Sequence, residues 1–412
     1  MTTAISQIMY ENGHKIPTFC EAGLKTNAYE NGHKVFPDET LDCFQLTIKD
    51  TEQFSVAISA SGDFTIDWGD GISDTINKTN TTNTAYTHDY TSRGNYYVKI
   101  RGLATGYNTS NFPCLGFPNR TEVIAVAGDL GAIFPQVGGV YPQSMFFNMF
   151  LGCSNLVSVR GDIFKTIYGA TSVNMFRGTF QSTKLATIPA SLFSGLTGAP
   201  ASSCFNGCFS GTKIKEVPAT LFHTMSGTPA SAAFQTMLLT TPITTLPVEL
   251  FSTFSGAPTF GLFQSMCSSC FALKSLPAGL FSMFGGATAT GMFYNVFSNS
   301  GLESVPDNLF GTFTGNPTSN CFNGMFYNCV NLATVSDKMW DISGMNNTSA
   351  ATIFDNLFKG CSKMTSSSPT LAYGNTTKLW EKFTAYTPSP STKPFTNCTL
   401  MADYDSVPST WK

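Results

Sequence analysis

Four aspartates in the first quarter of the chain carry the side chains that a Ca²⁺ site requires. Asp67, Asp70 and Asp74 lie close together, and Asp89 follows. Calcium takes six to eight oxygen ligands, many of them carboxylates. Aspartate also favours turns, because its side chain bonds to nearby backbone. Both interpretations stand at this point, and turn chemistry is favoured over a calcium site.

Two cysteines and three histidines are the other residues with chemical potential. Cys267 and Cys270 have the Cys-x-x-Cys spacing of metal and redox sites, but no second Cys or His pair follows at zinc spacing. We therefore interpret both as small buried apolar residues. His88 has no evident partner nucleophile, so we expect it to be structural. His14 and His33 occupy equivalent places in a duplicated hexapeptide; exposed turn residues are favoured there over a shared metal.

No catalytic motif is present in the sequence. It has no phosphate-binding Gly-x-x-x-x-Gly-Lys-Ser/Thr and no Gly-x-Ser-x-Gly turn. A carbohydrate-active enzyme would need a pair of carboxylates in a cleft, and the repeats described below are poor in Asp and Glu. We therefore expect a protein that is not an enzyme and has no cofactor.

The charge content also limits the partners. The chain has 23 Lys and Arg and 26 Asp and Glu among 412 residues, which is 12% charged, with a net charge of −3. A typical domain has about 25% charged residues. We expect no nucleic-acid binding and no membrane insertion, because there is neither a basic surface nor a long apolar segment. Residues 1–10 have no basic and apolar segments of the signal-peptide type, so we expect no ordinary signal peptide.

A repeat of 29–30 residues is the strongest feature of the sequence. Each unit begins with Phe-x-x-Met/Cys/Leu/Val, which a short polar stretch follows. The pattern Leu/Ile-x-x-Val/Leu-Pro-x-x-Leu-Phe comes next, and a Gly/Ser turn ends the unit. The repeated phenylalanines are Phe146, Phe176, Phe205, Phe234, Phe263, Phe293, Phe322 and Phe354. One unit cannot bury its own apolar face, but stacked units can. We expect these phenylalanines to form a continuous ladder.

Each unit suggests one short strand and one or two short helical segments. Residues 214–218 alternate apolar and polar, which favours a strand with one buried face. Phe234 and Leu238 are four residues apart, the spacing of a helix face. Cysteines recur seven residues after the ladder position and are expected to be small buried apolar residues: Cys153, Cys270, Cys329 and Cys361.

Two repeats carry a family resemblance. Met-Phe-Leu-Gly-Cys-Ser-Asn-Leu at 149–156 and Met-Phe-Tyr-Asn-Cys-Val-Asn-Leu at 325–332 resemble the hallmark of BspA-like leucine-rich repeats. That family occurs on bacterial surfaces and in some viruses and protists. The resemblance implies an α/β leucine-rich-repeat solenoid over residues 120–365, although the units are longer than the usual repeat.

The region before the repeats alternates apolar and polar residues like a set of strands. Candidate strands are 44–48, 54–58, 64–68, 86–90 and 96–100. Trp-Gly-Asp-Gly at 68–71, His-Asp-Tyr at 88–90 and Gly-Asn-Tyr-Tyr-Val at 94–98 resemble a PKD-type immunoglobulin-like module. The resemblance implies a small all-β sandwich that acts as a spacer or adhesion module.

The chain therefore divides into four predicted parts. They are an attachment segment with the duplicated Tyr-Glu-Asn-Gly-His-Lys hairpin (1–42), the PKD-like β-sandwich (43–106), the solenoid (120–365) and a C-terminal cap and tail (366–412). The predicted fold class is a multi-domain chain: the immunoglobulin-like sandwich followed by the α/β solenoid of 29–30-residue units.

These features lead us to expect an adhesion or structural protein. Adhesion-type modules without a secretion signal favour a virion protein, such as a phage fibre or appendage; a bacterial cell-surface adhesin is the alternative. The expected partners are other virion or surface proteins through the N-terminal segment and a host-surface glycan or protein through the repeats. A homo-oligomer is compatible with this expectation.

Overall fold

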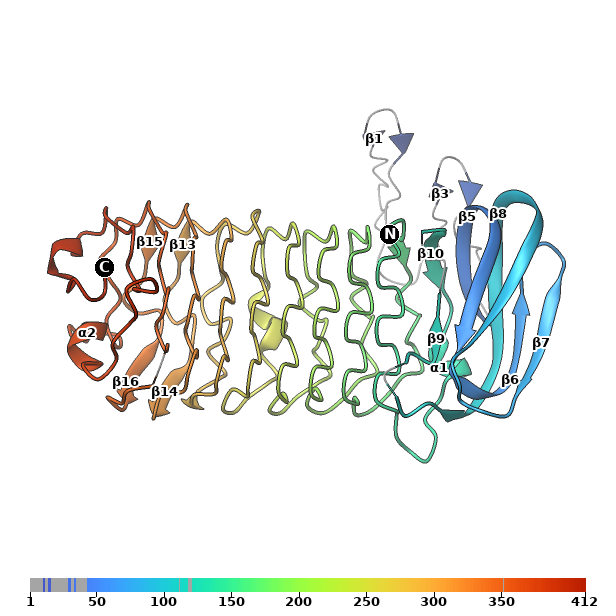
Figure 1. Ribbon diagram of the computed structural model, residues 1–412, viewed down its shortest axis with the longest axis horizontal. Coiled ribbons are helices and arrows are strands. Elements are labelled where there is room, and N and C mark those ends of the chain that lie inside the picture. The colour runs from blue at the N-terminus through green and yellow to red at the C-terminus, as the bar shows by residue number, and fades with distance from the viewer. Residues whose placement is uncertain are drawn as a thin grey trace, which may run out of the picture.

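The computed structural model describes residues 10–11, 14–15, 29–30, 33–34, 43–110, 112–117, 121–350 and 352–412. A β-sheet region lies at one end of an elongated molecule, and a column of stacked coils extends from it to the C-terminus (Figure 1). Most of the predicted attachment segment 1–42, including both Asn-Gly dipeptides of the hexapeptide, lies outside the described residues. The described pieces pair antiparallel as β1 (Tyr10–Glu11) with β2 (His14–Lys15) and β3 (Tyr29–Glu30) with β4 (His33–Lys34).

The sheet region is built on two long strands that pair with each other. A seven-stranded sheet has the order β11-β10-β5-β8-β6-β7, with β9 on β5. Its strands are β5 (Phe44–Ile58), β6 (Ala60–Asp67), β7 (Ser73–Lys78), β8 (Thr84–Tyr107), β9 (Leu115–Gly116), β10 (Val123–Ala127) and β11 (Ser158–Val159). All pairings are antiparallel except β10 with β11.

The predicted immunoglobulin-like sandwich needs correction, because these strands belong to one hydrogen-bonded sheet. The predicted strands 44–48 and 54–58 are both parts of β5, and 86–90 and 96–100 are both parts of β8. The polar residues between them read as strand ends, but the ladder continues through them with register shifts on either side of Thr51. Asp50, with a φ of 53°, lies at this irregularity. Bulges of this kind bend a strand without ending it.

The sheet continues directly into the coils. Strand β10 pairs with β5 on one side and with β11, from the first coil, on the other. Helix α1 (Leu130–Ile133) follows β10 and is capped by the Asp129 carboxylate, which accepts from the Gly131 N–H. One apolar cluster of buried residues runs from Phe44 to Trp411. We call residues 121–365 the coil stack.

The predicted α/β leucine-rich-repeat solenoid is wrong. Within the described residues, helix is limited to α1, α2 (Leu379–Lys382) and the 3-10 helices η1 (Val248–Phe251) and η2 (Tyr404–Ser406). No continuous parallel sheet lines the described part of the stack. Short parallel strands pair as β12 (Gly286–Ala287), β14 (Thr312–Gly315) and β16 (Asp341–Met345) in one sheet and β13 (Ser304–Val305) with β15 (Thr334–Val335) in another. Other coils are joined by isolated parallel bridges, such as Gly198 with Met225. The predicted strand at 214–218 is neither strand nor helix.

Runs of consecutive turns take the place of the predicted helices. The runs are 144–152, 174–182, 203–211, 232–240, 261–269, 291–299, 320–328 and 352–360, and in each the first, fifth and ninth residues have positive φ. In the run 203–211 these residues are Ser203 (54°), Gly207 (63°) and Gly211 (70°). An α-helix cannot include such left-handed residues. The four-residue apolar spacing that suggested a helix is the period of these turns.

Hydrogen bonds explain why the turn runs stack. Alternate N–H groups stay within the run, as when Cys208 donates to the Phe205 carbonyl at 3.1 Å. The others cross to the next coil: Phe205 donates to Ala233 at 2.9 Å and Phe209 to Met237 at 3.0 Å. Buried backbone groups are thus satisfied without regular strands or helices.

The C-terminal residues cover the last coil. The Phe395 ring stacks on Phe358 at 5.8 Å, and the Phe395 N–H donates to the Trp411 carbonyl at 2.9 Å. Trp411 is 4% exposed and also contacts the ladder residue Phe354. Among the described residues, no helix has the length and apolar character needed to cross a membrane.

Candidate functional site

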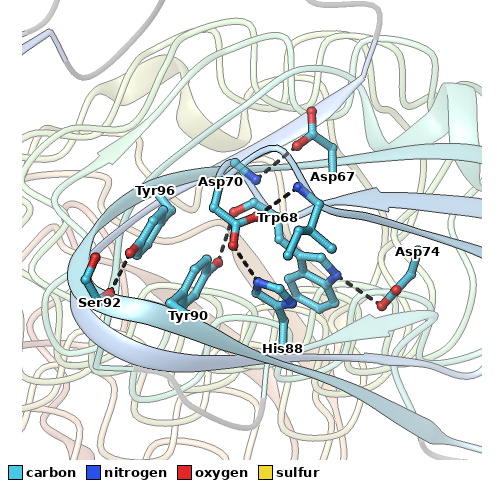
Figure 2. Close-up of polar contacts among 10 residues, drawn as sticks. Asp67, Trp68, Asp70, Asp74, His88, Tyr90, Ser92 and Tyr96 are labelled. Carbon is cyan, nitrogen blue, oxygen red and sulfur yellow. Dashed lines mark hydrogen bonds and ion pairs between the residues drawn. The ribbon is translucent and has the colours of Figure 1, made fainter.

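An aromatic cluster holds the turn between β6 and β7 against β8 (Figure 2). Trp68 follows β6, while His88 and Tyr90 are two residues apart on β8 and so share one face of the strand. The Trp68 and His88 rings are nearly parallel at 5.1 Å, and His88 meets Tyr90 edge-on at 4.7 Å. Tyr96 stacks on the far side of Tyr90 at 3.7 Å.

Polar contacts fix each member of this cluster. His88 Nε2 lies 2.8 Å from Asp70 Oδ2, and the Tyr90 hydroxyl donates to the Trp68 carbonyl at 3.0 Å. The Trp68 indole N–H donates to Asp74 at 3.0 Å. The cluster links three strands through its side chains, and His88 has a structural role in it.

The environment of the cluster shifts the pKa values of Asp70 and Tyr90. Burial disfavours the Asp70 carboxylate, but hydrogen bonds from His88 and the Ile72 N–H outweigh it, so the pKa of Asp70 is below its usual value. Burial, reinforced by the negative charge of Asp70, raises the pKa of Tyr90 well above its usual value. Asp70 is therefore charged and Tyr90 neutral near neutral pH.

The structure assigns separate partners to the four aspartates that suggested calcium. Asp67 accepts from the Gly69 N–H at 2.9 Å and Asp70 from the Ile72 N–H at 3.0 Å, which are turn contacts. Asp74 accepts from Trp68, and Asp89 from the Gln53 amide at 2.5 Å. Within the described ranges, no three His, Cys, Asp or Glu residues are grouped so that they could hold a metal ion.

The repeated phenylalanines stack along the whole coil stack. Each is fully buried at 0% exposure. The seven consecutive ring pairs from Phe146 to Phe354 have centroids 5.3–6.4 Å apart and interplanar angles of at most 22°. Their regular stacking makes the ladder the axis on which each coil is placed.

The predicted cysteine column is buried and binds backbone. Cys153, Cys270, Cys329 and Cys361 are all at 0% exposure. The Cys270 thiol donates to the Leu238 carbonyl at 3.2 Å and the Cys329 thiol to Phe297 at 3.1 Å. Burial raises the pKa of Cys329 to about 11, so it stays a thiol. Burial likewise holds the pKa of Cys267 well above its usual value.

Hydroxyl residues, which the cysteine spacing alone did not predict, complete this column. Thr183, Thr212 and Thr241 donate to carbonyls three residues back at 2.9, 2.8 and 2.7 Å. Ser300 contacts the Cys329 sulfur at 3.3 Å. The sequence signal for this column is a small side chain with a hydrogen-bond donor, either a thiol or a hydroxyl, seven residues after a ladder phenylalanine.

The outward side chains of the middle turn runs form a surface without charge. The runs 203–211, 232–240, 261–269, 291–299 and 320–328 contain no Asp, Glu, Lys, Arg or His. We call their outward side chains the turn face. Amides and hydroxyls bond along it from coil to coil, as when Asn206 Nδ2 donates to Gln235 at 2.8 Å and the Thr236 hydroxyl to Asn206 at 2.9 Å.

Comparison with protein-family models and with curated proteins finds no match for this chain. The resemblances to BspA-like repeats and to PKD-type modules therefore stay predictions from the quoted motifs.

Proposed function

We propose that this protein is a non-enzymatic adhesion protein of a virion, a fibre or appendage component that binds a host-surface partner through its coil stack. The observation that carries the proposal is the uncharged turn face, which is displayed along an elongated column (Figure 1). A long, regular column holds a binding surface away from its point of attachment.

The internal construction supports this role. The phenylalanine ladder and the hydrogen bonds between coils continue through eight turn runs, so a load on one coil passes to its neighbours. Several turn-face amides and hydroxyls are already bonded to one another, which lowers the conformational entropy that binding would remove.

Location tests the proposal. Peptide mass spectrometry is carried out on purified virus particles and on washed cell envelopes from the source culture. Stoichiometric enrichment in particles is expected. Enrichment in envelopes alone would contradict the virion assignment and favour a bacterial surface adhesin.

A further inference from the structure

Charge is the first property that selects a ligand for the turn face. The nearest charged residues in adjoining runs are Arg177 on one side and Asp355 and Lys359 on the other. Asp355 is 5% exposed and accepts from the Tyr386 hydroxyl at 2.5 Å, so it is already occupied. A charged ligand would lose hydration on this face without gaining a counter-charge, whereas a neutral one would not.

Two tyrosines give the face partly exposed aromatic rings. Tyr294 and Tyr327 lie in adjacent coils, which are joined by the Asn295 N–H to the Asn323 carbonyl (3.0 Å) and by the Asn299 N–H to the Tyr327 carbonyl (2.8 Å). In the described part of the chain, neither phenol hydroxyl has a hydrogen-bond partner.

A glycine lies three residues before each tyrosine. A Cβ on Gly291 would lie 3.9 Å from the Tyr294 Cβ. A Cβ on Gly324 would lie 3.7 Å from the Tyr327 Cβ but only 2.0 Å from Asn295 Oδ1, so the Asn295 amide already occupies the space at this glycine. The two rings can accept a flat apolar surface, such as the C–H face of a pyranose.

Asparagine amides of the same two coils are held by hydrogen bonds. The Asn328 amide donates to Asn299 at 2.9 Å, and the Asn323 amide donates to Asn320 at 2.8 Å. Each amide has two donors and an oxygen with two lone pairs. These bonds orient the groups, and the exposed Asn328 keeps capacity for a ligand, whereas Asn323 is only 8% exposed. Hydroxyl groups, which donate and accept, match such an array.

We propose that the turn face binds a neutral polysaccharide, with Tyr294 and Tyr327 stacking on its sugar rings and the neighbouring amides bonding its hydroxyls. The inference rests on the proposed function and adds the ligand class and the face. An apolar protein partner fits less well. In the described residues, the most exposed large hydrophobic side chains, such as Phe260 and Phe271, fall outside the five runs.

The test uses the full chain on immobilised neutral glucans, mannans and galactans, with heparin and polysialic acid as charged comparators. The variants are Tyr294→Ala and Tyr327→Ala. Phe271→Ala is the matched control, because this ring is 71% exposed and outside the turn face. Thermal melts establish that each variant is folded.

We expect binding to at least one neutral polysaccharide, weakened about tenfold by each tyrosine variant and unchanged by the control. Tyr294→Phe should retain most of the binding, because it retains the ring. Binding to charged polymers alone, no binding to any polymer, or equal binding by the alanine variants would overturn the inference.

The inference and the proposed function fail in different ways. If the protein is found on particles and competes for cells, but neutral polysaccharides do not inhibit it and protease treatment of the cells abolishes binding, only the inference is wrong. If the protein is absent from particles, the proposed virion function is wrong whatever it binds.

Discussion

The sheet region and the coil stack bury similar aromatic residues by opposite means. The sheet region depends on two long strands, β5 and β8, whose partners are distant in sequence, and on individual contacts such as those around Trp68. The coil stack repeats one local arrangement in which each run bonds to the next about 29 residues later. The fold of the sheet region therefore depends on specific contacts between residues distant in sequence. The fold of the coil stack depends on the spacing of the repeat and on small residues in its turns.

Removing a ladder ring should have the largest effect. Phe263→Ala leaves a cavity between two stacked neighbours, so we expect a loss of about 3–5 kcal/mol in the free energy of unfolding. Denaturant titration followed by far-UV circular dichroism measures it. Phe271→Ala, an exposed ring of the next segment, should change stability by less than about 0.5 kcal/mol. Equal effects would show that the ladder does not hold the stack together.

Replacing glycine with alanine should reduce stability more in the sheet region than in the coil stack. Gly102 in β8 has a φ of 135°, and an added Cβ would lie 2.2 Å from the Asp63 carbonyl oxygen. Gly198 in the stack has a φ of 72° with nothing within 4 Å of the added atom. We expect Gly102→Ala to cost about 2–3 kcal/mol and Gly198→Ala about 1 kcal/mol. The reverse order of melting temperatures would contradict the packing described for β6 and β8.

Acid should weaken the sheet region through Asp70. Because the folded-state pKa of Asp70 is lowered, its stabilisation is present above the unfolded-state pKa and is lost as pH falls through the folded-state value. We expect Asp70→Asn to cost about 1 kcal/mol at pH 7 and to reduce the loss of stability below about pH 4. Stability curves from pH 7 to pH 2 test this, and parallel curves for the two proteins would refute the role of the Asp70–His88 contact.

A small gain in stability is expected when glycine replaces a residue that is poorly suited to its left-handed backbone conformation. Ala232, Thr236 and Thr240 hold the three positive-φ positions of one run. A β-branched residue is disfavoured there. Thr240→Gly should therefore raise stability by about 0.5–1 kcal/mol. Thr244→Gly is the control: Thr244 does not have a positive φ and bonds to Lys215, so the change should destabilise. Destabilisation by Thr240→Gly would contradict the turn-run account.

The sequence predicted register better than local conformation. The repeat of Phe146 through Phe354 located the coils, because residues that stack recur at nearly equal spacing. The helices were wrong because Phe234 and Leu238 are four residues apart in turn runs as well as in helices. The recurrence of Asn320, Gly324 and Asn328 could have distinguished them, since these residue types tolerate positive φ.

The contacts of the site residues could not be predicted fully from the sequence, because they depend on the tertiary structure. Trp68, Asp70 and His88 were recognised as one motif, but the direction of each carboxylate depends on which strand faces it. Asp74 bonds to an indole and Asp89 to Gln53 of a neighbouring strand. The turn face could not be seen from any one repeat, because Tyr294 and Tyr327 come to lie in adjacent coils only when the coils stack.

We propose that this chain binds a host surface on behalf of a virus particle. Competition for adsorption tests it most directly: cells from the source culture are incubated with excess purified full chain, and particles are then added. We predict that adsorption falls with increasing protein concentration until the cell surface is saturated. Unchanged adsorption at all concentrations, with folded protein present, would contradict the account.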